Sequence, residues 1–150
     1  MKTVYFVQHG ISKPKDVDKD RPLSDVGSDE VHKVANYLKN HRIDIRKICH
    51  SGKLRARQTA SIFSEVLKVS EVSEHKGMNP KDRPEELISQ ITESAVLYVG
   101  HLPNIQNVIS NTINKDSANP VLKFQNAAVA CLEMDKGMGI IKWFITPEMC

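Results

Sequence analysis

The sequence predicts an α/β fold: a single-domain, three-layer sandwich with helices on both faces of a mostly parallel sheet that has an antiparallel edge. Two continuous apolar runs, at residues 4–7 and 95–99, are typical of strands buried on both faces. Stretches with apolar residues at helical spacing alternate with the strand patterns, as in proteins built around parallel sheets. Two late strand patterns flank Asp135-Lys136-Gly137 and predict a hairpin at one edge of the sheet.

The composition fits one globular domain over residues 1–150, with 40% hydrophobic and 26% charged residues. The three cysteines are odd in number and no pair has metal-ligand spacing, so we expect reduced thiols and a cytoplasmic location. No signal-peptide pattern or membrane-spanning run is present, which argues against a membrane partner. A net charge of +3 and few aromatic residues argue against nucleic acid.

The first predicted strand covers residues 3–8 and ends at His9, where Gly10 lets the backbone approach a ligand closely. From this segment alone, a catalytic histidine and an ordinary surface histidine are equally supported. A charged loop with two prolines follows. Ser24 is a good N-cap for a helix that runs to about residue 41. A second strand is predicted over residues 43–49, and the next helix has Arg55 in its first turn.

The second half of the chain begins with an irregular stretch that holds one short strand near residue 75. A short helix is predicted over residues 84–91, and the apolar strand at residues 95–99 ends at Gly100-His101. Pro103 suits the first position of the following helix. The hairpin strands are predicted near residues 127–134 and 140–145.

Parallel strands present their carboxyl ends at one edge of the sheet, so we expect His9, the turn at residues 51–55 and His101 to converge there. Arg55 offers a planar fork of donors to phosphoryl oxygens, and the first turn of its helix adds free backbone N–H groups. A neutral imidazole can attack phosphorus, and His9 is the candidate for this covalent step. A metal site is disfavoured, because Arg55 would repel the cation and no carboxylate or cysteine accompanies both imidazoles.

Four motifs carry a family resemblance: Gln8-His9-Gly10, Arg21-Pro22-Leu23-Ser24, the run from Ser51 to Ala60, and Gly100-His101-Leu102-Pro103. In this order they resemble the motifs of the histidine phosphatase (phosphoglycerate mutase-like) superfamily, most of all its SixA-type phosphohistidine phosphatases, and the match spans nearly the whole chain.

The resemblance implies that His9 is the nucleophile and that Arg55 and His101 bind the transferred phosphoryl group. It implies no metal and no organic cofactor. Ser12 and Arg21 stand where the family often adds contacts to the phosphate pocket, and Gln8 stands beside the nucleophile.

The sequence departs from the family pattern at two positions. Gln8 replaces the arginine that usually precedes the nucleophile, so the pocket loses one cation. Gly52 replaces the proline that commonly follows the serine of the second motif, which predicts a looser turn. A catalytically weakened or inactive phospho-ligand-binding protein is therefore an alternative to a phosphatase.

Breaking a phosphate ester needs a proton donor for the leaving oxygen, and Asp82, Glu85 and Glu86 are the candidates. For each of them, a role as part of a solvated, acidic helix start is favoured over a catalytic one. A leaving imidazole is easily protonated, so the sequence favours phosphohistidine over phosphate esters as the substrate. Residues 75–95 leave room for a short helix and not for a cap domain, which predicts an open pocket suited to a phosphate displayed on a protein.

These observations predict a metal-independent phosphatase that removes phosphate from phosphohistidine in a signalling or phosphotransfer protein. The alternatives are the inactive binder described above and a general phosphomonoesterase acting on small phosphate esters.

Overall fold

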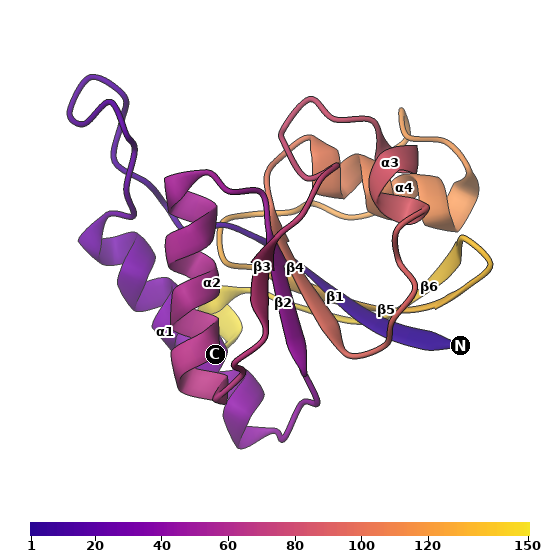
Figure 1. Cartoon of the computed structure of the whole chain (residues 1–150), viewed down its shortest axis with the longest axis horizontal. Coiled ribbons are helices and arrows are strands. Elements are labelled where there is room, and N and C mark those ends of the chain that lie inside the picture. Colours follow the sequence, from indigo (N-terminus) through magenta and orange to yellow (C-terminus); the bar gives the residue numbers. More distant parts are fainter.

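The computed structural model describes residues 1–150 and contains one six-stranded sheet in the order β3-β2-β4-β1-β5-β6 (Figure 1). The strands are β1 (Lys2–Gln8), β2 (Lys47–His50), β3 (Val72–Glu74), β4 (Val96–Gly100), β5 (Val129–Asp135) and β6 (Met138–Ile145). The helices are α1 (Asp25–Asn40), α2 (Leu54–Leu67), α3 (Pro84–Ile88) and α4 (Asn104–Asn114), and a short 3-10 helix, η1 (Pro147–Met149), follows β6.

The helices cover both faces of the sheet, which confirms the predicted three-layer α/β sandwich. Side chains of α1 and α2 pack on one face with Tyr5 and Val7, and side chains of α3 and α4 pack on the other with Val4 and Phe6. Strands β1 to β4 pair in parallel, while β5 and β6 pair antiparallel and form the predicted edge. β1 is therefore an inner strand that is buried on both faces, as its continuous apolar run predicts.

The second strand begins four residues later than predicted, at Lys47 rather than Ile43. The first backbone hydrogen bond from this segment toward β4 is made by Arg46, whose N–H donates to the carbonyl oxygen of Ala95, the residue before β4, at 2.8 Å. Ile43 and Ile45 pack against the core from the preceding turn, so their apolar character reports burial and not strand structure.

The hairpin also differs from its predicted limits. Ala127 lies outside β5 because its φ of 63° is left-handed, a conformation that does not occur within a strand. β6 starts earlier than predicted because Lys136 and Gly137, with φ of 51° and 75°, close a two-residue turn that pairs Asp135 with Met138.

The predicted helix limits shift by one to three residues. α3 ends at Ile88, and Ile91 reaches the core from the turn that follows. Pro103 is the N-cap of α4 and not its first helical residue. Ser24 is confirmed as the N-cap of α1, since its side chain accepts a hydrogen bond from the N–H of Gly27 at 3.0 Å.

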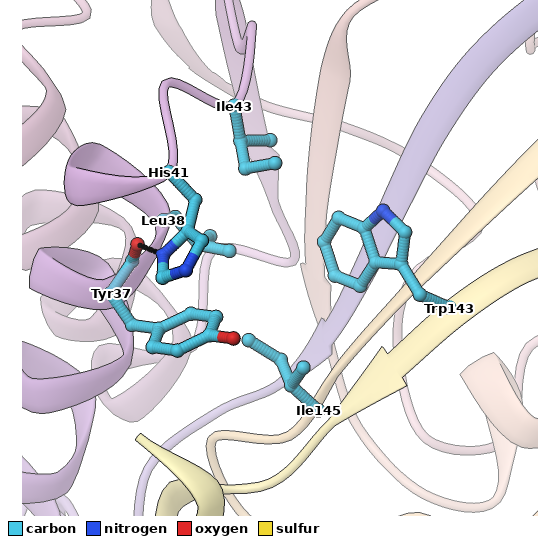
Figure 2. Close-up of a pocket in the computed structure, with 6 residues that line it drawn as sticks. All are labelled: Tyr37, Leu38, His41, Ile43, Trp143 and Ile145. Atoms are coloured by element: carbon cyan, nitrogen blue, oxygen red, sulfur yellow. Dashed lines mark hydrogen bonds between the residues drawn. The ribbon is translucent and has the colours of Figure 1, made fainter.

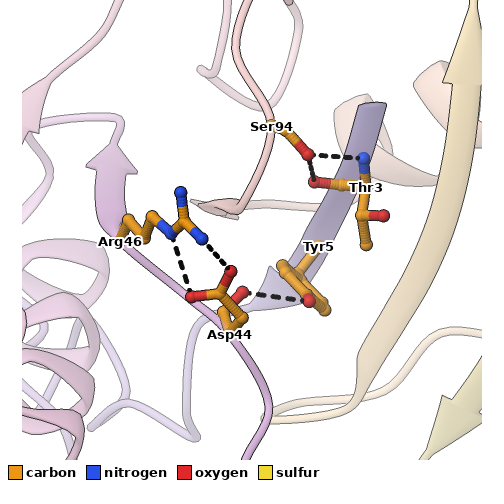
Figure 3. A network of polar contacts seen from close by, with 5 residues as sticks. All are labelled: Thr3, Tyr5, Asp44, Arg46 and Ser94. Atoms are coloured by element: carbon orange, nitrogen blue, oxygen red, sulfur yellow. Dashed lines mark hydrogen bonds and ion pairs between the residues drawn. The ribbon is translucent and has the colours of Figure 1, made fainter. Parts of the chain in front are cut away.

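Polar contacts connect the start of β1 to the loops before β2 and β4 (Figure 3). The hydroxyl of Tyr5 donates to the carbonyl oxygen of Asp44 at 3.1 Å, and the Asp44 carboxylate pairs with Arg46 at 2.8 Å. The N–H of Thr3 donates to the hydroxyl of Ser94 at 2.9 Å. These contacts engage the start of β1, and the opposite end of the same strand is left to carry the site.

Candidate active site

His9 follows the last residue of β1, and its backbone is held from both neighbouring strands. Its N–H donates to the carbonyl oxygen of Gly100 at 3.0 Å, and its own carbonyl oxygen accepts from the side-chain amide of Asn126 at 2.9 Å. The N–H of Gly10 donates to the Thr59 hydroxyl at 3.0 Å. A Cβ at Gly10 would lie 2.7 Å from Val31, so only glycine permits this close approach to α1. The position of His9 is thus fixed by β4, α1, α2 and the segment before β5.

The hydrogen bonds of the His9 ring define its protonation. Nδ1 lies 2.7 Å from the carbonyl oxygen of Gly10, which can only accept, so Nδ1 carries the proton. The Nε of Arg55 donates to Nε2 at 3.3 Å, so Nε2 presents its lone pair. Burial lowers the pKa of His9 to about 4, with Arg55 and Arg21 adding to the effect against the opposing bond to Gly10. His9 is therefore a neutral imidazole at neutral pH, with an unprotonated Nε2 that accepts from Arg55.

His101 follows β4 as His9 follows β1, and the structure brings the two rings together with 4.9 Å between their centroids. Burial, and after it the neighbouring His9 and Arg55, lower the pKa of His101 to about 3. Burial also lowers the pKa of Arg55, followed by the effect of Arg21. Neither arginine has a carboxylate within ion-pair distance. Two neutral imidazoles and two guanidinium groups without a carboxylate partner thus form a cluster suited to an anion.

Arg21 and Ser12 come from a narrow arm between β1 and α1, which projects from the body of the molecule (Figure 1). The N–H of Lys13 donates to the carbonyl oxygen of Pro22 at 2.8 Å, beside a backbone bridge between Ser12 and Leu23. Arg21 has a left-handed φ of 51°, which is uncommon for a residue with a side chain. This conformation lets its guanidinium donate to the Ser12 hydroxyl at 3.1 Å. The arm thus delivers the second cation to the base of the pocket.

Gln8 ends β1 and is paired in register with Gly100. Alternation along the strand directs its side chain to the face that carries α4, the same face as Phe6. The Oε1 atom of Gln8 is buried and has no hydrogen-bond partner. The structure shows no hydrogen bond from the Gln8 side chain to Arg55 or to either imidazole, and its Oε1 carries the cost of a buried acceptor without a partner.

The three acidic candidates are not brought to the imidazoles by any hydrogen bond. The Asp82 carboxylate accepts from the backbone N–H of Asn79 at 2.9 Å, and Glu85 pairs with Arg83 at 3.7 Å. Glu86 lies on the exposed side of α3.

A different carboxylate, which the sequence did not single out, lies nearer to the site. Glu74 ends β3, and its carboxylate fills the space that a Cβ at Gly52 would occupy. It lines a polar cleft together with Ser51, and the Ser51 hydroxyl lies 2.6 Å from Nε2 of His101.

Thr59, Asn126 and Ser51 are contact residues that the sequence reading left out of the site. Thr59 sits in an apolar helical stripe, and its polar side chain there is the one signal that pointed to a special role. Asn126 donates to the carbonyl oxygen of His9 because β5 pairs with β1, a neighbour relation that no local pattern reveals.

A hollow lined mostly by apolar side chains lies elsewhere in the molecule (Figure 2). It lies between the end of α1 and β6 and is lined by Tyr37, Leu38, His41, Ile43, Trp143 and Ile145. None of the predicted site residues lines it. No group of three or more His, Cys, Asp or Glu side chains is arranged to hold a metal ion. None of the helices combines the length and apolar character needed to cross a membrane.

The two buried imidazoles predict acid sensitivity of the fold. Unfolded histidine titrates near 6.5, whereas folded His9 and His101 stay neutral down to about 4 and about 3. Between these values the unfolded state binds more protons, so the stabilisation present above pH 6.5 is lost as the pH falls. Each imidazole adds a slope of up to about 1.4 kcal/mol per pH unit.

Denaturant titrations at several pH values measure this slope in the wild type and in His101→Asn, which should be less acid-sensitive. His32→Asn is the matched control, because His32 is exposed. The same pH slope in all three proteins would contradict the expectation.

Comparison with known proteins gives a consistent picture. The model of the histidine phosphatase superfamily (branch 1) matches residues 4–80, just over half of the chain. The phosphohistidine phosphatase SixA of Escherichia coli K12 is 26% identical over 156 aligned positions, covering 96% of this chain and 93% of that protein.

Two solved structures extend the comparison. The protein histidine phosphatase SixA complexed with tungstate superposes with a TM-score of 0.88 at 23% identity, covering 98% of both chains. A phosphoserine phosphatase from Entamoeba histolytica in complex with 3-phosphoglyceric acid gives a TM-score of 0.75 at 15% identity, covering 96% of both chains. These two likenesses establish a shared fold.

Proposed function

The chain belongs to the histidine phosphatase superfamily, and from this premise we propose that it removes phosphate from phosphohistidine in a signalling or phosphotransfer protein, without a metal ion. The observation that carries the proposal is the Nε2 lone pair of His9, held 3.3 Å from the unpaired guanidinium of Arg55. This is an uncharged nucleophile beside a cation that can bind the group under attack.

The proposed reaction has two steps. Nε2 of His9 attacks phosphorus, the P–N bond to the substrate imidazole breaks, and the leaving nitrogen takes a proton from solvent. Water then attacks the phosphohistidine formed on His9, and the electron pair of the second P–N bond returns to Nε2. Throughout, Nδ1–H stays bonded to the Gly10 carbonyl oxygen at 2.7 Å, which keeps the ring oriented. Arg55 and His101 bind the phosphoryl oxygens, and Ser12, Arg21 and Gln8 complete the pocket.

A P–N substrate suits this site better than a phosphate ester. Asp82 and Glu85 are engaged in other contacts, and no carboxylate bonds to His9, Arg55 or His101. An ester would leave as an oxyanion that needs a positioned acid, whereas an imidazole is readily protonated from water. The name of the Escherichia coli relative, phosphohistidine phosphatase, agrees with this choice.

The form of the site also favours a phosphate carried by a protein. Between β3 and β4 the chain builds only α3, a helix of five residues, so the structure has no element of cap-domain size there. The direct test is to incubate the protein with a phosphorylated histidine phosphotransfer protein and, separately, with an aryl phosphate. Turnover of the aryl phosphate alone would contradict the proposal and support a small-ester phosphatase, the activity that the name of the Entamoeba histolytica neighbour suggests.

Vanadate or tungstate is expected to bind between His9, Arg55 and His101, because these oxyanions match the charge and geometry of the phosphoryl group. Calorimetry should detect binding by the wild type and a loss of about tenfold or more in Arg55→Ala. Arg57→Ala is the matched control, because Arg57 is an exposed residue on the same turn of α2. A chelator should leave turnover unchanged. Activity that vanishes on chelation and returns with a divalent ion would rule out the metal-free mechanism.

The second candidate function is a phospho-ligand binder without turnover, and the observation that favours it is the buried Oε1 of Gln8, an uncharged group that has no hydrogen-bond partner. Such a protein would bind vanadate and form no phosphohistidine. As for location, all three cysteines are free thiols, which suits the reducing cytoplasm that we propose.

A further inference from the structure

The turn after β2 is held by two hydrogen bonds, although glycine at its centre predicts a loose one. The N–H of Gly52 donates to Nδ1 of His50 at 3.1 Å, and the N–H of Lys53 donates to the Ser51 hydroxyl oxygen at 3.3 Å. Proline at position 52 would have no N–H for the first bond and could not adopt the φ of 90° seen there. Gly52 therefore allows a turn that fixes the Ser51 side chain.

The Ser51 hydroxyl makes one further contact, 2.6 Å from Nε2 of His101. A hydroxyl has one proton to donate and can accept at its oxygen. The bond from Lys53 already uses the oxygen as an acceptor, and no other acceptor for the Ser51 proton lies within hydrogen-bond distance. Since Ser51 is 6% exposed, a proton without an acceptor there would carry the cost of an unpaired buried donor.

The other nitrogen of the same ring has the complementary property. Nδ1 of His101 is buried and has no partner in the chain. If His101 donated from Nε2 to Ser51, both the Ser51 proton and Nδ1 would be left unpaired. If Ser51 donates to Nε2, only the Nδ1–H group lacks a partner within the chain.

We propose that Ser51 is a positioning residue, which donates its hydroxyl proton to Nε2 of His101 and so keeps the ring proton on Nδ1 as a donor to the phosphoryl group. The hydrogen bond at one ring nitrogen thus decides which atom faces the ligand as a donor. The phosphoryl ligand rests on the proposed function, whereas the tautomer of His101 does not depend on it.

Nitrogen NMR of histidine-labelled protein tests the tautomer in the free protein, with no substrate present. In the wild type, the His101 signals should identify Nδ1 as protonated and Nε2 as unprotonated at neutral pH. Ser51→Ala removes the donor, so Nε2 is expected to take up the proton in part or in full. Ser51→Thr keeps a hydroxyl and should restore the wild-type signals.

Vanadate affinity provides the second measurement. Loss of the Nδ1–H donor should weaken binding in Ser51→Ala by about 10- to 100-fold, the cost of one hydrogen bond to a charged group. Ser51→Thr should recover most of this loss. The matched control is Ser110→Ala, which removes a fully buried hydroxyl that bonds within α4 to the carbonyl oxygen of Gln106 at 3.0 Å.

A wild-type spectrum with the proton on Nε2 would overturn the inference, as would a Ser51→Ala spectrum that keeps it wholly on Nδ1. The wild-type spectrum alone tests the tautomer of His101, so the inference can be overturned even if a variant folds poorly. Failure of the proposed function would look different: no turnover and no vanadate binding by a wild type whose His101 still carries its proton on Nδ1.

Discussion

Replacing His9 by alanine is expected to lower turnover of phosphohistidine by at least about 10⁴-fold, because the variant lacks the atom that forms the covalent bond. The domain should remain folded. The His9 side chain lies at the end of β1 and makes its hydrogen bonds to Gly10 and Arg55, both at the pocket, while the cores on either face are built from other residues.

Acid-labile phosphate trapped on the protein is the decisive measurement for this variant. Wild-type protein quenched during turnover should carry it, and His9→Ala should not. His32→Ala serves as the control for loss of an imidazole, since His32 is exposed on α1. Full turnover by His9→Ala would remove His9 from the mechanism, even if the oxyanion still binds in the pocket.

Gln8→Arg is expected to raise kcat/KM by roughly ten- to a thousand-fold, by analogy with the effect of a single donor to a developing oxyanion. The substitution exchanges a buried amide whose Oε1 has no partner for a cation beside the phosphoryl group. A charge-assisted hydrogen bond is about twice as strong as a neutral one. Vanadate should also bind more tightly to the variant.

Gln8→Met separates charge from size at this position, because it fills a similar volume without a donor and should not raise kcat/KM. If the wild type is inert and Gln8→Arg turns over phosphohistidine, the natural protein is a binder whose catalysis was lost at this residue. If the wild type is already fast and Gln8→Arg changes neither readout, Gln8 is not a phosphate ligand. Arg21, which already brings a cation to the pocket, would explain such a result.

The sequence predicted the fold correctly where an apolar pattern corresponds both to burial and to a regular strand. The apolar runs in β1 and β4 are buried on both faces, and both patterns were interpreted correctly. The strand limit predicted at Ile43 was wrong because apolar residues such as Ile43 and Ile45 also pack against the core from turns. The limit predicted at Ala127 was wrong because the amino-acid sequence does not show that this residue has a left-handed φ. Element limits depend on hydrogen-bond partners that lie elsewhere in the chain.

In the candidate site, too, the sequence predicts what depends on strand order and misses what depends on single contacts between distant residues. His9, Arg55 and His101 could be placed together from the sequence, because strand order and the common edge of a parallel sheet bring them there. Ser51 and Asn126 each make one hydrogen bond to a residue far away in the chain, Ser51 to Nε2 of His101 and Asn126 to the carbonyl oxygen of His9. Such contacts cannot be predicted from the local sequence. None of the acidic candidates hydrogen-bonds to an imidazole: the Asp82 carboxylate accepts from the N–H of Asn79, and Glu85 pairs with Arg83.

The position of β1 in the sheet also sets when the surroundings of His9 can form. β1 is the first strand to be synthesised, yet it pairs with β4 and β5, so that Val4 lies between Val96 and Leu132. Contacts this distant in the chain close slowly, because the loop entropy is lost before the pairing energy is gained. A nascent or truncated chain that ends before β5 leaves one side of β1 as an open, apolar edge, which favours aggregation. The strand that leads to His9 is thus paired on both sides only after the chain has been made as far as β5.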